Sequence, residues 1–293
     1  MTDLLVDAPT VAPKGRSLIG DAFRRLARNR AASVSAVLLA LIALVCFLGP
    51  LFSPWHLDDV DYGAFMTPPD AVHWFGTDAN GRDLLVRTFY GGQVSLTVGV
   101  VASLVSLVIG VGYGAVAGYF GGRVDSLMMR LVDILYSLPF IFFVILLVVF
   151  FGRSIVLIFA AIGAVEWLDM ARIVRGQTLS LKRREFIEAA EACGVSSGAI
   201  IRRHIVPNTL SPVMVYVTQT VPRVILLESF LSFIGLGVQE PMTSWGVLIA
   251  EGTSNLEIAP WMLCFPAAFL AATLFSLNFL GDGLRDAFDP RDR

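Results

Sequence analysis

Residues 88–122 read TFYGGQVSLTVGVVASLVSLVIGVGYGAVAGYFGG and contain no acidic or basic side chain. The core of a bilayer offers the backbone no hydrogen-bond partner, so an uncharged segment of this length is expected to cross it as a helix. Working outward, three more intervals lack Asp, Glu, Lys and Arg, namely 31–57, 134–152 and 258–281. These four intervals are predicted to be transmembrane helices.

Two further segments are long enough to span a membrane although they contain charges. Residues 154–170 and residues 209–236 each carry two ionisable side chains. Charges inside a span are tolerated when they face the bundle or reach toward its ends. The chain is also 56% hydrophobic and only 16% charged, against roughly 25% charged residues in soluble domains. The sequence therefore predicts an all-α membrane protein with six transmembrane helices.

Basic residues are distributed unevenly between the connections. Of the 22 Lys and Arg residues, 18 lie before the first span, after the last span, or in the second and fourth connections. Because basic loops resist translocation, these parts and both termini are predicted to be cytoplasmic. The formal net charge of -2 gives no indication of a nucleic-acid partner.

The predicted organisation follows from these spans and charges. The basic and apolar start of the chain also fits the outline of a signal peptide, but its apolar run is too long and lacks a small-residue cleavage site, so we expect a retained anchor. The predicted segments are a cytoplasmic tail (1–30) with an interfacial amphipathic part from Leu18 to Arg30, a first transmembrane helix (31–54), an outer loop (55–92), a five-helix core (93–282) that includes a cytoplasmic hairpin (178–207), and a cytoplasmic tail (283–293).

Glycines recur at every fourth position in the second span, at Gly110, Gly114, Gly118 and Gly122. This spacing places a stripe without side chains on one face of a helix, where another helix can approach closely. Packing within the chain is favoured over a role in a subunit interface.

The predicted hairpin begins with a short amphipathic helix. Its apolar face is expected to carry Phe186, Ala189, Ala190 and Cys193, and its acidic face Glu185, Glu188 and Glu191. Gly194 is predicted to end this helix, because glycine readily adopts a positive φ at a helix C-terminus.

A second short helix is predicted to follow, capped by Ser196 or Ser197 and closed by Pro207. It carries Ile200, Ile201 and Ile205, with Arg202, Arg203 and His204 near its carboxyl end. A polar hairpin between two spans has no role in crossing the membrane. Its apolar face is therefore expected to bind a soluble protein from the cytoplasm.

The hairpin resembles a known motif. Glu188, Ala189 and Ala190, followed by Gly194, Ile205 and Pro207, are similar to the EAA loop of ABC-importer membrane subunits. In that family the loop docks into a groove on the ATP-hydrolysing subunit, and the resemblance assigns this coupling role to the same residues here, together with Arg202, Arg203 and His204.

Further motifs resemble the C-type permease subunit of oligopeptide and dipeptide importers. In the outer loop these are His73 to Asp78 and Gly81-Arg82-Asp83. Later segments are Ser229 to Gly237, Ser244-Trp245-Gly246, and Gly281 to Ala287 with Asp289-Pro290. Trp167 to Arg175 and Gln239-Glu240-Pro241 are most similar to the oligopeptide branch, so the resemblance predicts ATP-driven import of oligopeptides. The likeness extends from about Arg24 to the carboxyl end. It departs at Glu191 and Cys193, where many relatives carry a basic or small residue and a leucine.

This resemblance implies a type I ABC-importer permease fold in a bacterial inner membrane. The implied partners are a B-type permease subunit, two ABC ATPases and a periplasmic peptide-binding protein. No G-x-x-x-x-G-K-[ST] motif occurs in the sequence, so ATP and magnesium are expected on the partner ATPases, with no cofactor in this chain. The resemblance also predicts that the outer-loop signature Gly76, Thr77, Asp78, Gly81, Arg82 and Asp83 shapes the loop for contact with the binding protein.

Ionisable residues within spans are candidates for function. Arg223 and Glu228 are expected either to line the pathway or to form an intramembrane pair. Glu166 and Asp169 are expected to reach the headgroups or Arg172.

Other chemistry has little support in the sequence. The acidic outer loop does not match a calcium-loop pattern, and the three cysteines lack metal-ligand spacing, so no metal site is expected. The histidines have no Ser or Cys nucleophile nearby, which argues against a hydrolase. The alternatives that stay open are a dipeptide or nickel permease of the same family, an ion-coupled secondary transporter, and a membrane scaffold without transport.

Overall fold

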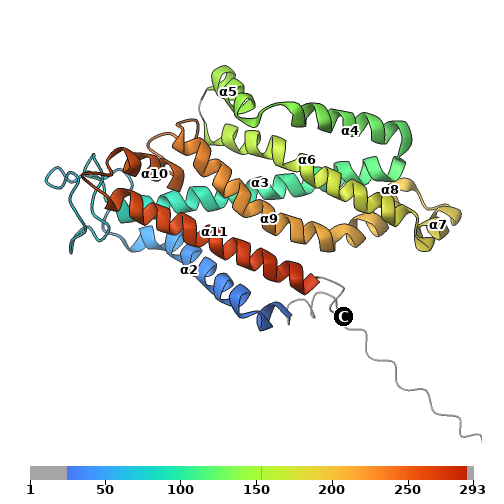
Figure 1. Ribbon diagram of the computed structural model, residues 1–293, viewed down its shortest axis with the longest axis horizontal. Helices are drawn as coiled ribbons and strands as arrows, with labels where there is room; N and C mark the ends of the chain where they lie inside the picture. Colours follow the sequence, from blue (N-terminus) through green and yellow to red (C-terminus); the bar gives the residue numbers. More distant parts are fainter. Residues whose placement is uncertain (1–24, 153, 289–293) are drawn as a thin grey trace, which may run out of the picture.

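The computed structural model describes residues 25–152 and 154–288 as a long bundle of helices (Figure 1). The predicted interfacial segment lies largely outside the described residues, as do residues 289–293. The helices are α2 (Arg30–Phe52), α3 (Leu84–Phe120), α4 (Gly122–Ser137), α5 (Phe140–Phe151), α6 (Ile155–Lys182), α7 (Glu185–Ala192), α8 (Ser197–Ile200), the π-helix η1 (Ile201–Ile205), α9 (Val206–Phe233), α10 (Trp245–Ser254) and α11 (Trp261–Phe288).

Four of the described helical segments are long and apolar enough to cross a membrane. They are Arg30–Phe52, Leu84–Phe120, Ser197–Phe233 and Trp261–Ala287, and the bent pair α4–α5 adds a fifth if it counts as one span. α6 is not among them, because Glu166, Asp169 and Arg172 interrupt its apolar stretch. The described helices thus support a multi-pass membrane protein with four or five spans of this kind.

The prediction of one continuous helix over residues 134–152 is wrong. α4 and α5 meet at an angle of 82°. Pro139 has no backbone N–H and disfavours the helical conformation at Leu138, which is extended at φ -77° and ψ 126°. The interval is apolar, as predicted, but the proline breaks the helix.

The predicted outer loop is too long at its carboxyl end. α3 begins at Leu84, where the Asp83 side chain caps it by accepting a 2.9 Å hydrogen bond from the Val86 N–H. Arg87 caused the error, because a charged residue next to an apolar run suggested a loop. Its side chain is instead buried and ion-paired.

Helices α3 and α6 pack closely along the glycine stripe. An added Cβ at Gly110, Gly114 or Gly118 would collide with Met170, with the backbone of Ala171, or with Thr178, all on α6. The stripe therefore serves packing within this chain. Gly122 lies beyond the end of α3, at the first residue of α4.

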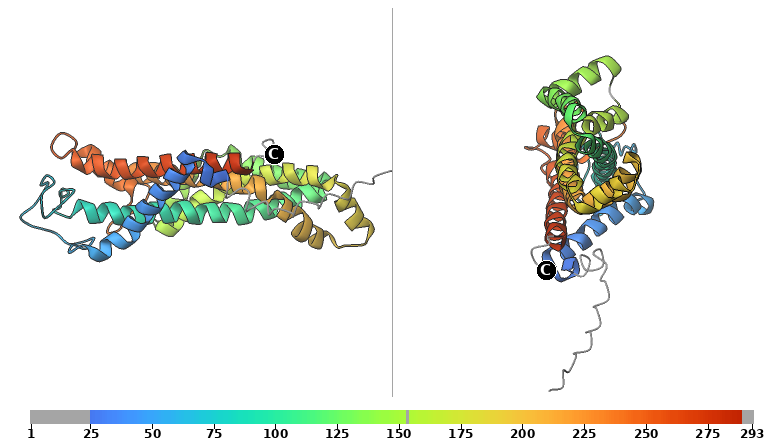
Figure 2. Two further views of the ribbon diagram at one scale, coloured as in Figure 1. Left: turned by 90° about the horizontal axis from the view of Figure 1, so that it is seen from below. Right: turned by 90° about the vertical axis from the view of Figure 1, so that its right-hand side faces the viewer.

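The two ends of the bundle carry different structures (Figure 1, Figure 2). The outer loop and α10 lie at one end, and the short helices α7 and α8 lie at the other. The start of α2 and the end of α11 both point away from the outer loop. Helix α10, which packs against α9 and α11, was not predicted.

Candidate functional site

The hairpin at one end of the bundle turns at Gly194. This residue has φ +77°, and the N–H groups of Gly194 and Val195 donate to the carbonyls of Glu191 and Ala190 at 2.9 and 3.1 Å. These bonds satisfy the last carbonyls of α7, as a glycine C-terminus does. The predicted turn lies where the sequence placed it, and Ser196 occupies the N-cap position of α8.

Buried isoleucines attach the hairpin to the bundle. Ile187, Ile200 and Ile205 have no exposed surface and pack in one cluster with residues of α3 and α6. The Tyr119 hydroxyl of α3 adds a 3.0 Å hydrogen bond to Glu191. The hairpin is therefore a fixed projection of the bundle.

A second apolar face of the hairpin is uncovered in this chain. Phe186 is 44% exposed, and Ala189 and Cys193 are exposed beside it. Ala190, predicted on the same face, packs instead against the buried cluster, and Ile187 is the anchoring residue that the sequence reading missed. The EAA residues thus divide between anchoring the hairpin and forming an uncovered apolar face.

The prediction that Pro207 closes the second helix is wrong. α8, η1 and α9 follow one another without a break, and Pro207 lies in the first turn of α9. In the π segment the Val206 N–H bonds to Ile201, five residues earlier, and this wide turn accommodates the missing N–H of proline. Arg202 and Arg203 are exposed on this segment, and the His204 ring lies 6.5 Å from that of Phe186.

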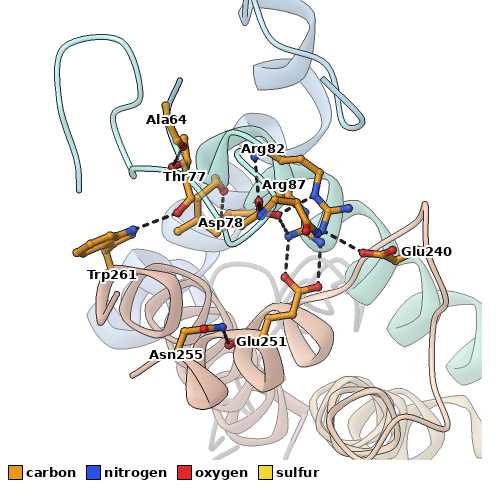
Figure 3. A network of polar contacts seen from close by, with 12 residues as sticks. Ala64, Thr77, Asp78, Arg82, Arg87, Glu240, Glu251, Asn255 and Trp261 are labelled. Carbon is orange, nitrogen blue, oxygen red and sulfur yellow. Dashed lines mark hydrogen bonds and ion pairs between the residues drawn. The ribbon is translucent and has the colours of Figure 1, made fainter. Parts of the chain in front are cut away.

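At the opposite end, Asp78 lies between two arginines (Figure 3). Arg82 Nε donates to Asp78 Oδ2 at 2.7 Å, and Arg87 Nη1 contacts the same oxygen. Arg82 Nη2 also donates to Glu240 at 3.0 Å, while Arg87 donates to both oxygens of Glu251 at 2.7 and 3.0 Å. The network joins the outer loop to the α9–α10 connection and to α10.

The rest of the outer-loop signature shapes the chain around this network. Gly76 and Gly81 both have positive φ. The buried Thr77 hydroxyl donates to the Ala64 carbonyl, and Asp83 accepts a 2.9 Å contact from the ring of the buried His73. All six predicted signature residues therefore take part in one folded loop.

The pairing of Glu240 and Glu251 with arginines was not predicted, because the partners lie about 160 residues apart in the sequence. A usable signal was present, since residues 237–260 contain acidic but no basic residues. A partly buried acid in such a segment, here Glu251, needs a cation from elsewhere in the chain.

Arg82→Ala should reduce transport about tenfold, because it removes the hydrogen bonds from Arg82 to Asp78 and Glu240. Assembly should stay near normal, because Arg87 still pairs with Asp78. Burial alone would lower the pKa of Arg82. The hydrogen bonds and charges of Asp78 and Glu240 have the larger combined effect, so the pKa of Arg82 is raised. Uptake divided by the amount of assembled complex measures the effect. Glu240→Gln is the milder control, since that carboxylate is 63% exposed. Unchanged uptake in Arg82→Ala at normal expression would contradict the prediction that Arg82 shapes the outer loop for contact with a binding protein.

Arg223 and Glu228 do not form the intramembrane pair considered for them. Glu228 is fully buried and accepts hydrogen bonds from Ser95 at 2.9 Å and Ser232 at 2.7 Å. Its side chain is enclosed within this chain, which contradicts a pathway-lining role. Arg223 is 52% exposed, with Nη1 3.5 Å from Asp169.

The expected contacts of Glu166 and Asp169 with Arg172 or the headgroups also need correction. Arg172 instead bonds Asp133 at 2.8 Å, and Glu166 is buried. Asp169 faces Arg223, because α6 continues as a helix against α9 through this region.

Comparisons with known proteins agree with this arrangement. A family model described as "Binding-protein-dependent transport system inner membrane component" matches residues 110–293. The chain belongs to this family. A second model, the N-terminal TM domain of oligopeptide transport permease C, matches residues 17–69. The chain is thus a multi-pass inner-membrane permease subunit of the ABC-importer type, of the oligopeptide-permease C class, and not a catalytic enzyme.

Individual relatives cover nearly the whole chain. The oligopeptide transport system permease protein OppC of Escherichia coli K12 is 60% identical over 96% of this chain and 93% of its own length. The dipeptide transport system permease protein DppC of Bacillus subtilis 168 is 44% identical over 98% and 90%. Among solved structures, the inward-facing MetNI methionine ABC transporter matches with TM-score 0.57 at 18% identity, covering 69% of this chain and 96% of the other. This likeness shows a shared fold.

Proposed function

We propose that this chain forms one half of the membrane pathway of an ATP-driven oligopeptide importer, with a B-type permease subunit as the other half. Oligopeptides are favoured because the model of the N-terminal TM domain of oligopeptide transport permease C matches residues 17–69, and four relatives named as oligopeptide permeases are 56–60% identical. The proposed topology has six crossings, counting α4–α5 and α6 as one each, with both termini in the cytoplasm.

The observation that carries the proposal is the uncovered apolar face of the hairpin. Phe186, Ala189 and Cys193 are exposed on a projection that buried isoleucines hold rigidly. Such a face on a water-facing hairpin favours a protein partner. We infer that an ABC ATPase docks there, that ATP and magnesium bind to that partner, and that a second ATPase docks on the B-type subunit.

We further propose that the outer loop contacts a periplasmic peptide-binding protein. The arginine network supports this role because it links the loop to α10 at the end of the bundle opposite the hairpin (Figure 1). Contact at one end and ATPase movement at the other would then act on the same set of helices.

Gly194→Glu is expected to uncouple ATP hydrolysis from transport. The position has φ +77°, which an L side chain adopts only with strain, so the turn and the docking face would shift. Reconstituted complex should retain ATPase activity but lose peptide uptake by about tenfold or more. Gly198→Glu is the matched control, since Gly198 is also exposed on the hairpin but has no positive φ.

The same reconstitution separates the alternatives. Uptake driven by an ion gradient without ATPases would overturn the importer proposal in favour of a secondary transporter. Peptides of graded length and nickel distinguish the oligopeptide, dipeptide and nickel permeases. A membrane scaffold without transport predicts no peptide uptake even by the wild-type complex, and that Gly194→Glu is harmless. Normal coupling in Gly194→Glu would contradict the docking role of the hairpin.

A further inference from the structure

Two grooves on α11 differ in chemistry. The groove between α2 and α11 holds about 330 Å³ and is lined by apolar residues such as Leu41, Val45 and Phe269. The groove between α9 and α11 holds about 370 Å³, and five of its ten lining residues have polar or charged side chains. Its polar side chains are Thr218, Gln219, Arg223, Asn278 and Asp282.

Arg223 lies deep along its helix. It precedes the end of α9 at Phe233 by ten residues, which is about 15 Å at 1.5 Å per residue. An arginine that faces lipid tails at such a depth is energetically unfavourable. Because Arg223 is 52% exposed in this chain, its groove is suited to water and polar solute rather than to lipid tails.

The ion pair of Arg223 is loose. A single contact of 3.5 Å joins Nη1 to Asp169 Oδ2, and the two side chains are 52% and 33% exposed. By contrast, Arg175 donates two hydrogen bonds of 2.6 Å each to the Asp125 carboxylate. Tyr216 also interacts with the Arg223 side chain. Beside these two partners, the planar guanidinium can still bind a second carboxylate in bidentate fashion.

We propose that Arg223 binds the C-terminal carboxylate of a peptide as it passes, with Asp169 as the counter-ion that the carboxylate displaces. This inference rests on the proposed peptide import. The C-terminal carboxylate is the anion that every unmodified peptide carries, so one arginine recognises it whatever the side chains are. Gln219, one helical turn before Arg223, and Asn278 across the groove offer hydrogen bonds to the peptide backbone.

The test compares trialanine with its C-terminal amide in proteoliposomes that contain the full complex and the binding protein. For each peptide, ATP-driven uptake by Arg223→Gln is divided by uptake by the wild type, which cancels any preference of the binding protein. The ratio should fall about tenfold for the free acid and stay within about twofold of unity for the amide. Arg223→Lys should restore part of the free-acid uptake, because it keeps the charge without the planar fork.

The outcomes separate this inference from the function on which it rests. If the wild type imports neither peptide, the proposed function fails. If the wild type imports both and Arg223→Gln lowers both ratios equally, Arg223 is structural or contacts another subunit, and the inference is overturned. Unchanged ratios for both peptides overturn it as well.

Discussion

Gly114→Val is expected to prevent α3 and α6 from packing, and so to leave little stably folded protein in the membrane. A Cβ at this position would run into the Ala171 carbonyl oxygen and lie 2.9 Å from the Arg175 backbone nitrogen. Backbone atoms cannot rotate away as a side chain does, so the two helices must separate. Overpacking usually lowers the free energy of unfolding by about 1–3 kcal/mol, and we expect Gly114→Val to lower it by at least about 3 kcal/mol.

Gly112→Val is the matched control for this substitution. Gly112 lies on the same helix two residues earlier, is exposed, and has no atom within 4 Å of an added Cβ. Thermal unfolding of both variants in detergent measures the difference. A melting temperature for Gly114→Val equal to that of Gly112→Val would show that the α3–α6 contact does not hold the bundle together.

The positions of several helices were predictable because hydrocarbon imposes one simple rule. Apolar residues without charge must form spanning helices, and the uncharged intervals correspond to α2, α3 and α11. The break at Pro139 is equally local, and attention to that residue would have found it. Composition and proline position therefore account for α2, α3, α4, α5 and α11.

Tertiary pairing explains most of what the sequence did not reveal. From the sequence alone Arg87 is expected in a loop. In the fold it lies on α3 and pairs with Asp78 and with Glu251, which is 164 residues away. From the sequence alone Glu228 is a candidate pathway residue. In the fold, serines of α3 and α9 donate hydrogen bonds to its buried carboxylate. A charge in an apolar segment signals that a partner exists, but the fold decides which partner it is.

The hairpin shows the same division between local and tertiary information. The turn at Gly194 follows from backbone conformation, and it was predicted. The apolar residues of α7 point in two directions, with Ile187 toward the bundle and Phe186 outward. Helical periodicity alone could not tell which of them the chain itself would cover.

Ala189→Glu is expected to abolish stable binding of the ATPase. Ala189 follows Phe186 by three residues and precedes Cys193 by four, so all three share the exposed apolar face of α7. A carboxylate there would lose its hydration on docking without a cation to replace it. We expect affinity for the ATPase to fall about a hundredfold, while the isolated chain folds normally.

The most direct measurement is the amount of ATPase that copurifies with this chain. Ala192→Glu serves as the control, because Ala192 is exposed on the same short helix but lies four residues after Glu188, on its acidic face. We expect Ala192→Glu to retain the ATPase at the wild-type ratio and Ala189→Glu to lose it. Equal retention by the two variants would contradict the claim that the ATPase docks on the face formed by Phe186, Ala189 and Cys193.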